Sequence, residues 1–241
     1  MKVRIMEISK LSKSITPSGT MAISNKARVL REEGKPVIGF GAGEPDFPTP
    51  EYVIKDVQVA AEDPANHKYS AVAGLNILKD EIVRTSELYS GIEIGQENIV
   101  VSNGGKHAIL TTFMSLLNPG DEVLIPSPYW TTYPEAVKIS GGNPIIVDTE
   151  FDDDFKINTD QLEALKTNKT KILVWVSPSN PTGVVYTKEE AEKIYNWAFD
   201  NDIWILSDEL YEHLVYEGVT SPSPAQYDKT LKNTIVINGV A

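Results

Sequence analysis

The sequence predicts an α/β fold in which a mostly parallel sheet is covered by helices on both faces, as a three-layer sandwich. From residue 51 onward, short runs rich in Val, Ile and Leu alternate with longer amphipathic segments. Strands that alternate with helices favour parallel pairing, because each helix returns the chain across one face of the sheet. Glycine and proline separate many of these segments, as in "LLNPGDEVLIP". Ligands in such a fold bind beyond the carboxyl ends of the strands, so a site is expected in the loops that follow strands.

The composition is that of a globular protein with an acidic surface. The 241 residues include 22 Lys and Arg against 34 Asp and Glu, and this net charge of −12 argues against nucleic acid as a partner. The absence of cysteine excludes disulfides, thiolate catalysis and cysteine-ligated metals. No apolar run approaches the roughly 18–20 residues of a membrane-spanning helix, and the start "MKVRIMEISKLSKS" lacks the apolar core of a signal peptide. We therefore expect a cytoplasmic protein that uses neither a metal nor a membrane.

The first 50 residues predict an appendage to the main domain. Residues up to 35 are expected to be helical after an irregular start, and the stretch "KPVIGFGAGEPDFPTP" predicts a short strand and then a loop rich in Gly and Pro. We place the boundary in this loop. Residues 1–45 would form an N-terminal arm with part of a small domain, and residues 46–241 the large domain.

The sequence of the large domain predicts helices that alternate with strands. The helix that begins near Thr187 has Glu190 at the spacing of a capping box, and Thr159 is the expected cap of the preceding helix. Pro134 lies inside one segment that is otherwise helical. Helices are expected over residues 51–63, 74–90, 106–118, 131–141, 159–167 and 187–202, and strands over residues 98–103, 121–128, 143–149, 170–178, 203–209 and 234–238.

Two glycine-rich loops suggest ligand contacts. "GFGAGEPD" does not have the spacing of a dinucleotide-binding loop, and Pro45 breaks a helix there, so it predicts either a flexible turn or a backbone that passes close to a ligand. In "VVSNGGKHAI", Gly104 and Gly105 lie between an expected strand and an expected helix. Exposed backbone N–H groups and the positive end of a helix bind anions, usually phosphate. A tight turn without a ligand explains the same pattern equally well.

Three other loops place polar or aromatic side chains after expected strands. Trp130 in "SPYW" is either a core residue or a ring that stacks on a planar ligand. Asn180 in "SNPTG" belongs to a turn, yet its amide lies at the mouth of the sheet. Asp208 in "SDELY" ends an apolar strand, with Tyr211 three residues later. A carboxylate there is either a cap or the partner of a cationic group, for example a protonated ring nitrogen.

Together these stretches resemble the fold-type I aminotransferases that use pyridoxal 5′-phosphate, and most closely the aspartate aminotransferase-like branch of class I. "GAGEPDFPTP", "SPSNPTGVVY" and "SDELYEHLVYEG" occur in the order and spacing of that family. The resemblance spans nearly the whole chain and rests on several separate motifs. It implies that residues 46–241 are most of a cofactor-binding domain.

The resemblance implies roles around the cofactor. Gly104, Gly105 and Lys106 would lie at its phosphate, and Trp130 would stack on its pyridine ring while also touching the substrate. Tyr69 would reach the phosphate of a neighbouring subunit, which implies a homodimer with shared sites.

Further roles concern the ring and the substrate. Asn180 and Tyr211 would bond the 3-oxygen of the ring, and Asp208 would pair with its protonated nitrogen. Gly43 and Asn180 would meet the α-carboxylate of the substrate. The segment of residues 18–20, including Thr20, would close over the site.

The implied reaction is transamination between an amino acid and a 2-oxo acid, with a lysine that holds the cofactor as a Schiff base. The resemblance places this lysine directly after Ala241 and the small domain beyond it, so the sequence is expected to be part of a longer enzyme. Lys106 matches a position that recognises acidic side chains, which favours aspartate, glutamate or a similar diacid. Alternatives are an aminotransferase for aromatic amino acids, alanine or prephenate, a lyase on the same fold, or a sensor that has lost catalysis.

Overall fold

The computed structural model describes residues 6–17, 19–41, 43, 47–216 and 218–240. The backbone packs as two compact units, residues 1–72 and residues 73–241. Expectations that concern Ser18 and Ala241 fall outside the described residues. The boundary between residues 45 and 46, drawn from the sequence, stays a prediction.

The first unit is helical, as expected. It contains α1 (Lys10–Ser14), α2 (Gly19–Glu32), α3 (Glu51–Glu62) and the 3₁₀ turn η1 (Pro64–His67). The strand predicted in residues 35–40 is wrong. Residues 35–40 form no regular secondary structure, and both Ile38 and Phe40 are exposed to solvent.

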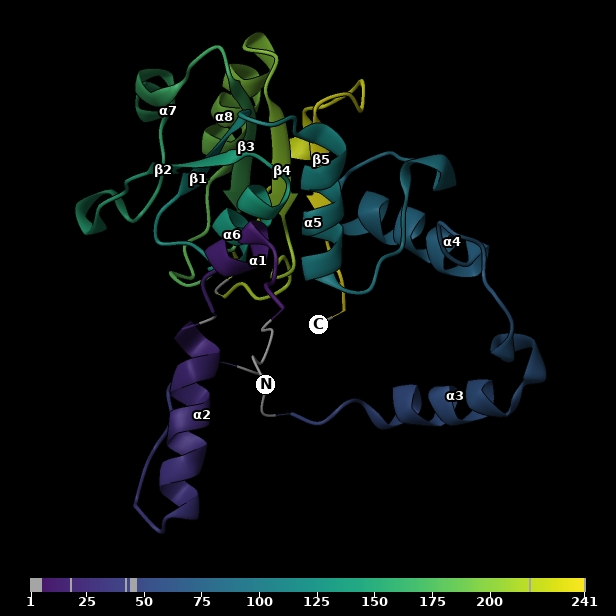
Figure 1. Cartoon of the computed structure of the whole chain (residues 1–241). Coiled ribbons are helices and arrows are strands. Elements are labelled where there is room, and N and C mark those ends of the chain that lie inside the picture. The colour runs from purple at the N-terminus through teal and green to yellow at the C-terminus, as the bar shows by residue number, and fades with distance from the viewer. Residues whose placement is uncertain (1–5, 18, 42, 44–46, 217, 241) are drawn as a thin grey trace. The chain divides into compact units, whose positions relative to one another are not determined.

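The second unit is built on a parallel sheet, which confirms the predicted fold class (Figure 1). In the described part of the chain its strands lie in the order β2-β1-β3-β4-β5, and every neighbouring pair is parallel. After β1 the chain runs to β2 on one side and then to β3 on the other, so the order reverses between β1 and β3. Such a reversal is where open α/β sheets bind ligands. The strands are β1 (Glu122–Pro126), β2 (Asn143–Val147), β3 (Thr170–Val176), β4 (Trp204–Asp208) and β5 (Thr234–Ile237).

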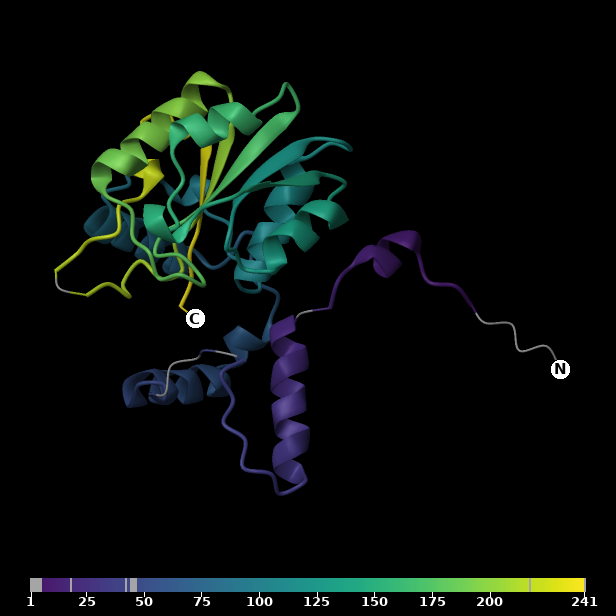
Figure 2. The ribbon, with the colours of Figure 1, turned by 90° about the vertical axis from the view of Figure 1, so that its left-hand side faces the viewer.

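Helices cover both faces of the sheet, as Figure 2 shows. Successive strand residues point to opposite faces. Leu173 and Ile205 belong to the core shared with α7 and α8, whereas Ile172 and Leu206 belong to the core shared with α5 and α6. The helices of this unit are α4 (Asn76–Thr85), α5 (Gly105–Leu116), α6 (Thr132–Ile139), α7 (Thr159–Leu165) and α8 (Lys188–Asp200). The shorter turns are η2 (Ser86–Ser90), η3 (Gln96–Asn98), η4 (Phe151–Asp153) and η5 (Pro224–Gln226).

Local signals explain most helix ends. At the start of α8, the Thr187 hydroxyl accepts a hydrogen bond from the Glu190 N–H, and the Glu190 carboxylate accepts one from the Thr187 N–H. These two bonds confirm the predicted capping box. The cap of α7 is Asn158 and not Thr159 as predicted, because the Asn158 side chain accepts from the Gln161 N–H at 3.0 Å. Pro134 is tolerated because it lies in the first turn of α6, where an N–H would have no helical acceptor.

The strand predicted over residues 98–103 is also wrong. The 3₁₀ turn η3 covers its beginning, and the Val101 N–H donates to the Ala73 carbonyl at 3.0 Å without a ladder of paired residues around it. Ile99 is buried and Val100 is exposed, but none of the described strands pairs with this run. None of the described helices is long and apolar enough to span a membrane.

The loop before β5 depends on Asp228, which gives a first prediction. Its carboxylate accepts from the backbone N–H groups of Lys232, Asn233 and Thr234 and from the Thr230 hydroxyl, at 3.0–3.2 Å. Burial opposes the charge, but these donors outweigh it and lower the pKa of Asp228 below its ordinary value of 3.8. We expect Asp228→Asn to cost about 1–3 kcal/mol in the free energy of unfolding at neutral pH, because an amide cannot accept all of these bonds.

The pH dependence of this difference has a definite sign. A carboxyl group with a lowered pKa stabilises the folded state above its unfolded pKa and loses that contribution as the pH falls through its folded pKa. The difference in the free energy of unfolding between the wild type and Asp228→Asn, measured by urea unfolding, should therefore become smaller below about pH 4. A gap that stays constant from pH 7 to pH 3 would contradict this role.

Candidate active site

The N-terminus of α5 has features that are typical of an anion-binding position. Gly104 precedes the helix with φ of 83°, a left-handed conformation that favours glycine. α5 has 12 residues, its first turn contains no acidic residue, and no side chain caps it in the part of the chain that the structure describes. Neither a side-chain cap nor an acidic residue of the first turn therefore neutralises the positive end of this helix dipole.

Aromatic rings lie next to this helix end. Lys106, the second residue of α5, places its Nζ atom 5.3 Å from the centre of the Trp130 ring. Trp130 in turn meets Tyr133 edge-to-face, with 5.6 Å between ring centres. Trp130 is half-buried, so one part of its surface stays accessible to a ligand.

Asp208 is the buried charge of the site. It ends β4, where strand alternation turns its side chain toward the layer of α5 and α6, and it is only 4% exposed. The Tyr133 hydroxyl donates to its Oδ2 atom at 2.6 Å, and the Leu210 N–H donates to Oδ1 at 3.3 Å. Burial raises the pKa of Asp208, although these two donors counteract the shift. Burial and the neighbouring carboxylate also raise the pKa of Tyr133, so the phenol keeps its proton and acts as the donor.

The strand ends bring further predicted residues together. Val176, Asp208 and Ile237 lie side by side across β3, β4 and β5, so the loops after these strands meet at one edge. From these loops, the Asn180 amide donates to the Tyr211 hydroxyl at 3.3 Å. This contact joins the two side chains that the resemblance assigns to the same oxygen atom.

Leu210 connects the helix end with the turn after β5. A Cβ atom built on Gly105 would lie 2.9 Å from one methyl group of Leu210, and one built on Gly239 would lie 3.1 Å from the other. Both glycines therefore allow a close approach that a larger residue would disturb.

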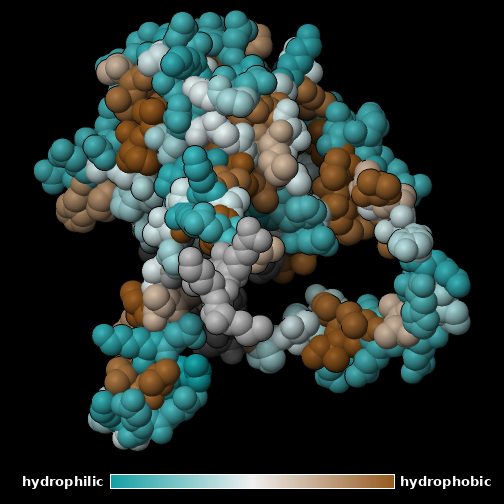
Figure 3. All heavy atoms as spheres, in the orientation of Figure 1, coloured by the Kyte–Doolittle hydropathy of each residue, from teal (hydrophilic) through white to brown (hydrophobic). Residues whose placement is uncertain are grey.

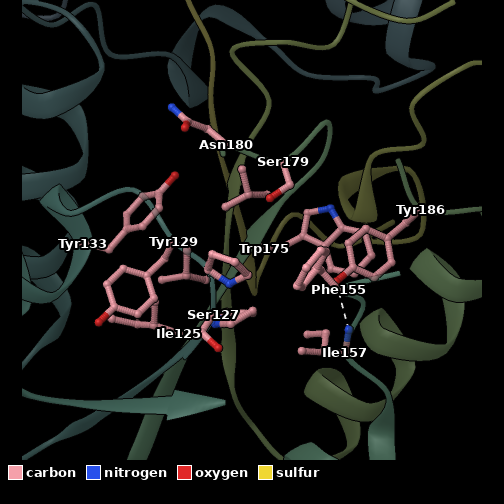
Figure 4. Close-up of a pocket in the computed structure, with 14 residues that line it drawn as sticks. Ile125, Ser127, Tyr129, Tyr133, Phe155, Ile157, Trp175, Ser179, Asn180 and Tyr186 are labelled. Carbon is pink, nitrogen blue, oxygen red and sulfur yellow. Dashed lines mark hydrogen bonds between the residues drawn. The ribbon is translucent and has the colours of Figure 1, made fainter. Parts of the chain in front are cut away.

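A small cavity lies at the reversal point of the sheet (Figure 4). Its volume is about 20 Å³, which suits one water molecule and not a ring-shaped ligand. Figure 4 shows Tyr129 and Tyr133 on the side opposite Trp175 and Tyr186, with Asn180 above them. The Tyr186 hydroxyl accepts from the Ile157 N–H at 3.1 Å. Of the candidate binding residues, Asn180 lines this cavity, which is itself too small to be the ligand site.

The structure places the predicted site residues of the second unit in neighbouring loops, and it tests the binding role of none of the predicted residues. Tyr69, Gly43 and Thr20 belong to the first unit, which is described by itself. Tyr69 is fully exposed, and a Cβ atom built on Gly43 would meet nothing within 4 Å. Their roles stay predictions. The predicted site residues that lie in the second unit are Gly104, Gly105, Lys106, Trp130, Asn180, Asp208 and Tyr211.

Sequence reasoning missed two residues of this region. Tyr133 lies in the first turn of α6, and its position in the sequence near Trp130 does not by itself indicate the contact with Asp208. Glu209 is fully enclosed, and it accepts from the Ser207 and Ser223 hydroxyls at 2.5 Å each. Burial raises its pKa to about 7. No pattern in the sequence distinguished it from the exposed glutamates.

Comparison with known proteins agrees with this geometry. Residues 35–241 match the family described as aminotransferase class I and II. The chain is 46% identical over 229 residues to an aspartate aminotransferase of Streptomyces avermitilis, covering 95% of this chain and 56% of that protein. It is 44% identical to an aspartate aminotransferase of Bacillus subtilis, covering 98% of this chain and 60% of that protein.

Solved structures give the same result. An aspartate aminotransferase from Thermus thermophilus, solved with maleate, superposes with a TM-score of 0.92 at 37% identity. The match covers 98% of this chain and 61% of that one, so the chain spans well under two thirds of the length of these relatives. On the family match and these identities together, the chain belongs to the class I and II aminotransferases.

Proposed function

We propose that the full protein is a pyridoxal-phosphate-dependent aminotransferase that moves the amino group of an acidic amino acid to a 2-oxo acid. The observation that supports this most strongly is the buried Asp208, held by Tyr133 at 2.6 Å. A buried carboxylate is costly unless it faces a cation, and the protonated nitrogen of a pyridine ring is such a cation. The relatives named aspartate aminotransferase support the same activity.

The residues present fit this cofactor. The uncapped end of α5 suits a phosphate, with Gly104, Gly105 and Lys106 as its binding segment. Trp130 offers a ring face for stacking beside that segment. When bound, the cofactor supplies an electron sink that stabilises negative charge at the substrate Cα atom.

The polar side chains of the site would fix the ring from the other side. Asn180 and Tyr211 are already hydrogen-bonded to each other and would both hold the 3-oxygen of the ring. Asp208 would hold the proton on the ring nitrogen, because its negative charge stabilises a cation beside it. Tyr133 orients that carboxylate. We assign the lysine that forms the covalent link to the position after Ala241, on the resemblance alone.

The substrate and the partner subunit involve residues of both units. Gly43, Asn180 and Thr20 would surround the substrate, and Tyr69 of a second copy would reach the phosphate. The homodimer is proposed on the resemblance; within the first unit, α3 has no buried residue. Its apolar side chains gather on the surface in Figure 3, and those exposed are Tyr52, Ile54, Val57 and Val59. A cytoplasmic location fits this proposal.

One experiment tests the activity. The full-length protein is mixed with L-aspartate and 2-oxoglutarate, and the formation of oxaloacetate is followed together with the visible absorbance of the cofactor. We expect both signals. Cofactor absorbance without amino transfer to any 2-oxo acid would favour a lyase. Amino transfer that uses only aromatic amino acids, only alanine, or only prephenate as the acceptor would assign a different substrate class. The absence of cofactor absorbance after incubation with pyridoxal phosphate would overturn the proposal.

Lys106 is predicted to determine the preference for diacids. Its ammonium group lies over Trp130, beside the proposed ring position, where it can meet a second carboxylate. Maleate, which the Thermus thermophilus structure contains, is a dicarboxylate and supports this substrate class. We expect Lys106→Ala to lower kcat/KM for aspartate about 10- to 100-fold, the loss of one charged hydrogen bond, and to leave alanine nearly unchanged.

The control for this prediction is Lys193→Ala on α8, which covers the opposite face of the sheet. It should leave both substrates unaffected. Equal losses for aspartate and alanine in Lys106→Ala would assign this lysine to the phosphate and not to the substrate.

A further inference from the structure

Glu212 joins three segments that are distant in the sequence. It lies in the loop after β4, and its Oε2 atom accepts from the Ser90 hydroxyl at 2.9 Å. Its Oε1 atom accepts from the Asn238 amide at 2.6 Å, and the side chain is only 18% exposed. Ser90 ends η2, and Asn238 is the first residue after β5. Both oxygen atoms of one carboxylate are therefore used to connect other segments.

The Asn238 side chain is held at both ends. Its Nδ2 atom donates to Glu212, and its Oδ1 atom accepts from the Gly239 N–H at 2.7 Å. An amide fixed in this way holds the turn after β5 in one orientation. The turn also packs against Leu210, which borders Gly105 at the start of α5. A shift of the turn would therefore displace Leu210 and, through it, the start of α5 at the proposed phosphate site.

The other partners of Glu212 are themselves fixed. Ser90 is buried, and its carbonyl accepts from the Gln226 amide at 2.6 Å. The end of β5 is held directly, because the Glu209 N–H donates to the Ile237 carbonyl at 2.9 Å. Glu212 is thus anchored to the body of the unit on one side and holds the exposed Asn238 on the other.

We propose that Glu212 is a positioning residue, which acts through Asn238 to set the orientation of the turn after β5. This inference rests on the proposed function, in which that turn leads to the cofactor-linking lysine. A carboxylate suits the role because it accepts two hydrogen bonds at once. A glutamine keeps one acceptor for Asn238, and the Ser90 hydroxyl can then accept from its amide. An alanine removes both contacts.

The test compares Glu212→Ala, Glu212→Gln and Asn238→Ala in the full-length holoenzyme. The first readout is the pH at which the visible absorbance of the bound cofactor changes. We expect Glu212→Ala to shift it by about half a unit or more, since a charged hydrogen bond near the site is lost. Asn238→Ala should give the same shift, the double variant should add nothing to it, and Glu212→Gln should restore most of it.

Glu122→Ala is the matched control. Its Oε2 atom accepts from the Thr167 hydroxyl at 2.5 Å and the Thr170 hydroxyl at 3.4 Å, but it lies at the start of β1, the opposite edge of the sheet. This variant should lower the urea midpoint without any spectral shift. If Glu212→Ala likewise changes only the urea midpoint, its role is structural and the proposal is overturned.

A second readout does not need the cofactor. Hydrogen exchange at the Gly239 amide in the cofactor-free protein should be about tenfold faster in Glu212→Ala and in Asn238→Ala, and unchanged in Glu122→Ala. An unchanged Gly239 amide in the first two variants would reject the proposal even if the wild type binds no pyridoxal phosphate. If Glu212→Ala does not fold, the spectral shift of Asn238→Ala, compared with Glu122→Ala, makes the test at an exposed position.

Discussion

Replacing Asp208 by asparagine is expected to lower kcat/KM for aspartate and 2-oxoglutarate by about 10²- to 10⁴-fold. Removing one partner of a buried ion pair costs about 3–5 kcal/mol, and each 1.36 kcal/mol corresponds to a factor of ten in rate. Asparagine keeps the shape of the side chain but cannot hold a proton on the ring nitrogen by charge. Steady-state kinetics of the full-length enzyme measure this loss.

The same substitution should not destabilise the cofactor-free protein at neutral pH. Burial raises the folded pKa of Asp208, so its contribution to stability is present below the unfolded pKa and is lost as the pH rises through the folded pKa. At neutral pH, above the unfolded pKa, the wild type therefore bears the free-energy cost of this raised pKa, which asparagine does not have. A large loss of activity without a loss in urea midpoint is the expected combination.

Two variants provide the comparison for Asp208. Tyr133→Phe removes only the hydroxyl that donates to Asp208, so we expect a smaller loss of about 10- to 100-fold. Asp148→Asn, in an exposed loop after β2, should keep wild-type activity. If Asp208→Asn retains activity within threefold of Asp148→Asn, the pairing with a cationic ring is wrong.

Phe113→Ala is expected to lower the free energy of unfolding by about 3–5 kcal/mol, the usual cost of removing a buried phenylalanine ring. Phe113 on α5 is 0% exposed and packs in the core with Val123 and Ile125 of β1. The next residue, Met114, is 62% exposed on the same helix, so Met114→Ala should change the free energy by less than about 0.5 kcal/mol.

Urea unfolding followed by tryptophan fluorescence compares these two neighbours directly. Because they share one helix, differences in helix propensity largely cancel. Similar losses in the two variants would mean that α5 does not cover the sheet in the way described. The result also concerns the site, since α5 begins at the glycines of the proposed phosphate segment.

The sequence by itself determined the element order and the residue types of the site. Alternation of apolar runs with amphipathic segments predicted β1 to β5 and the helices between them, because a parallel sheet requires such crossovers. Motif order identified the candidates Gly104, Asn180 and Asp208. The two strands predicted in error, over residues 35–40 and 98–103, contain β-branched residues as true strands do. They failed because strand formation needs a partner ladder, which local composition does not encode.

Only the tertiary structure decided which side chains meet. The Tyr133–Asp208 contact spans 75 residues and the Ser90–Glu212 contact spans 122, so no local pattern specifies either pair. The burial of a side chain likewise depends on contacts between residues that are distant in the sequence. Glu209 and the exposed glutamates are the same residue type in the sequence, yet burial raises the pKa of Glu209 to about 7, against the opposing effect of the Ser207 and Ser223 hydroxyls. The sequence thus determines which groups are available, whereas the approach of distant strand ends sets their distances, charges and partners.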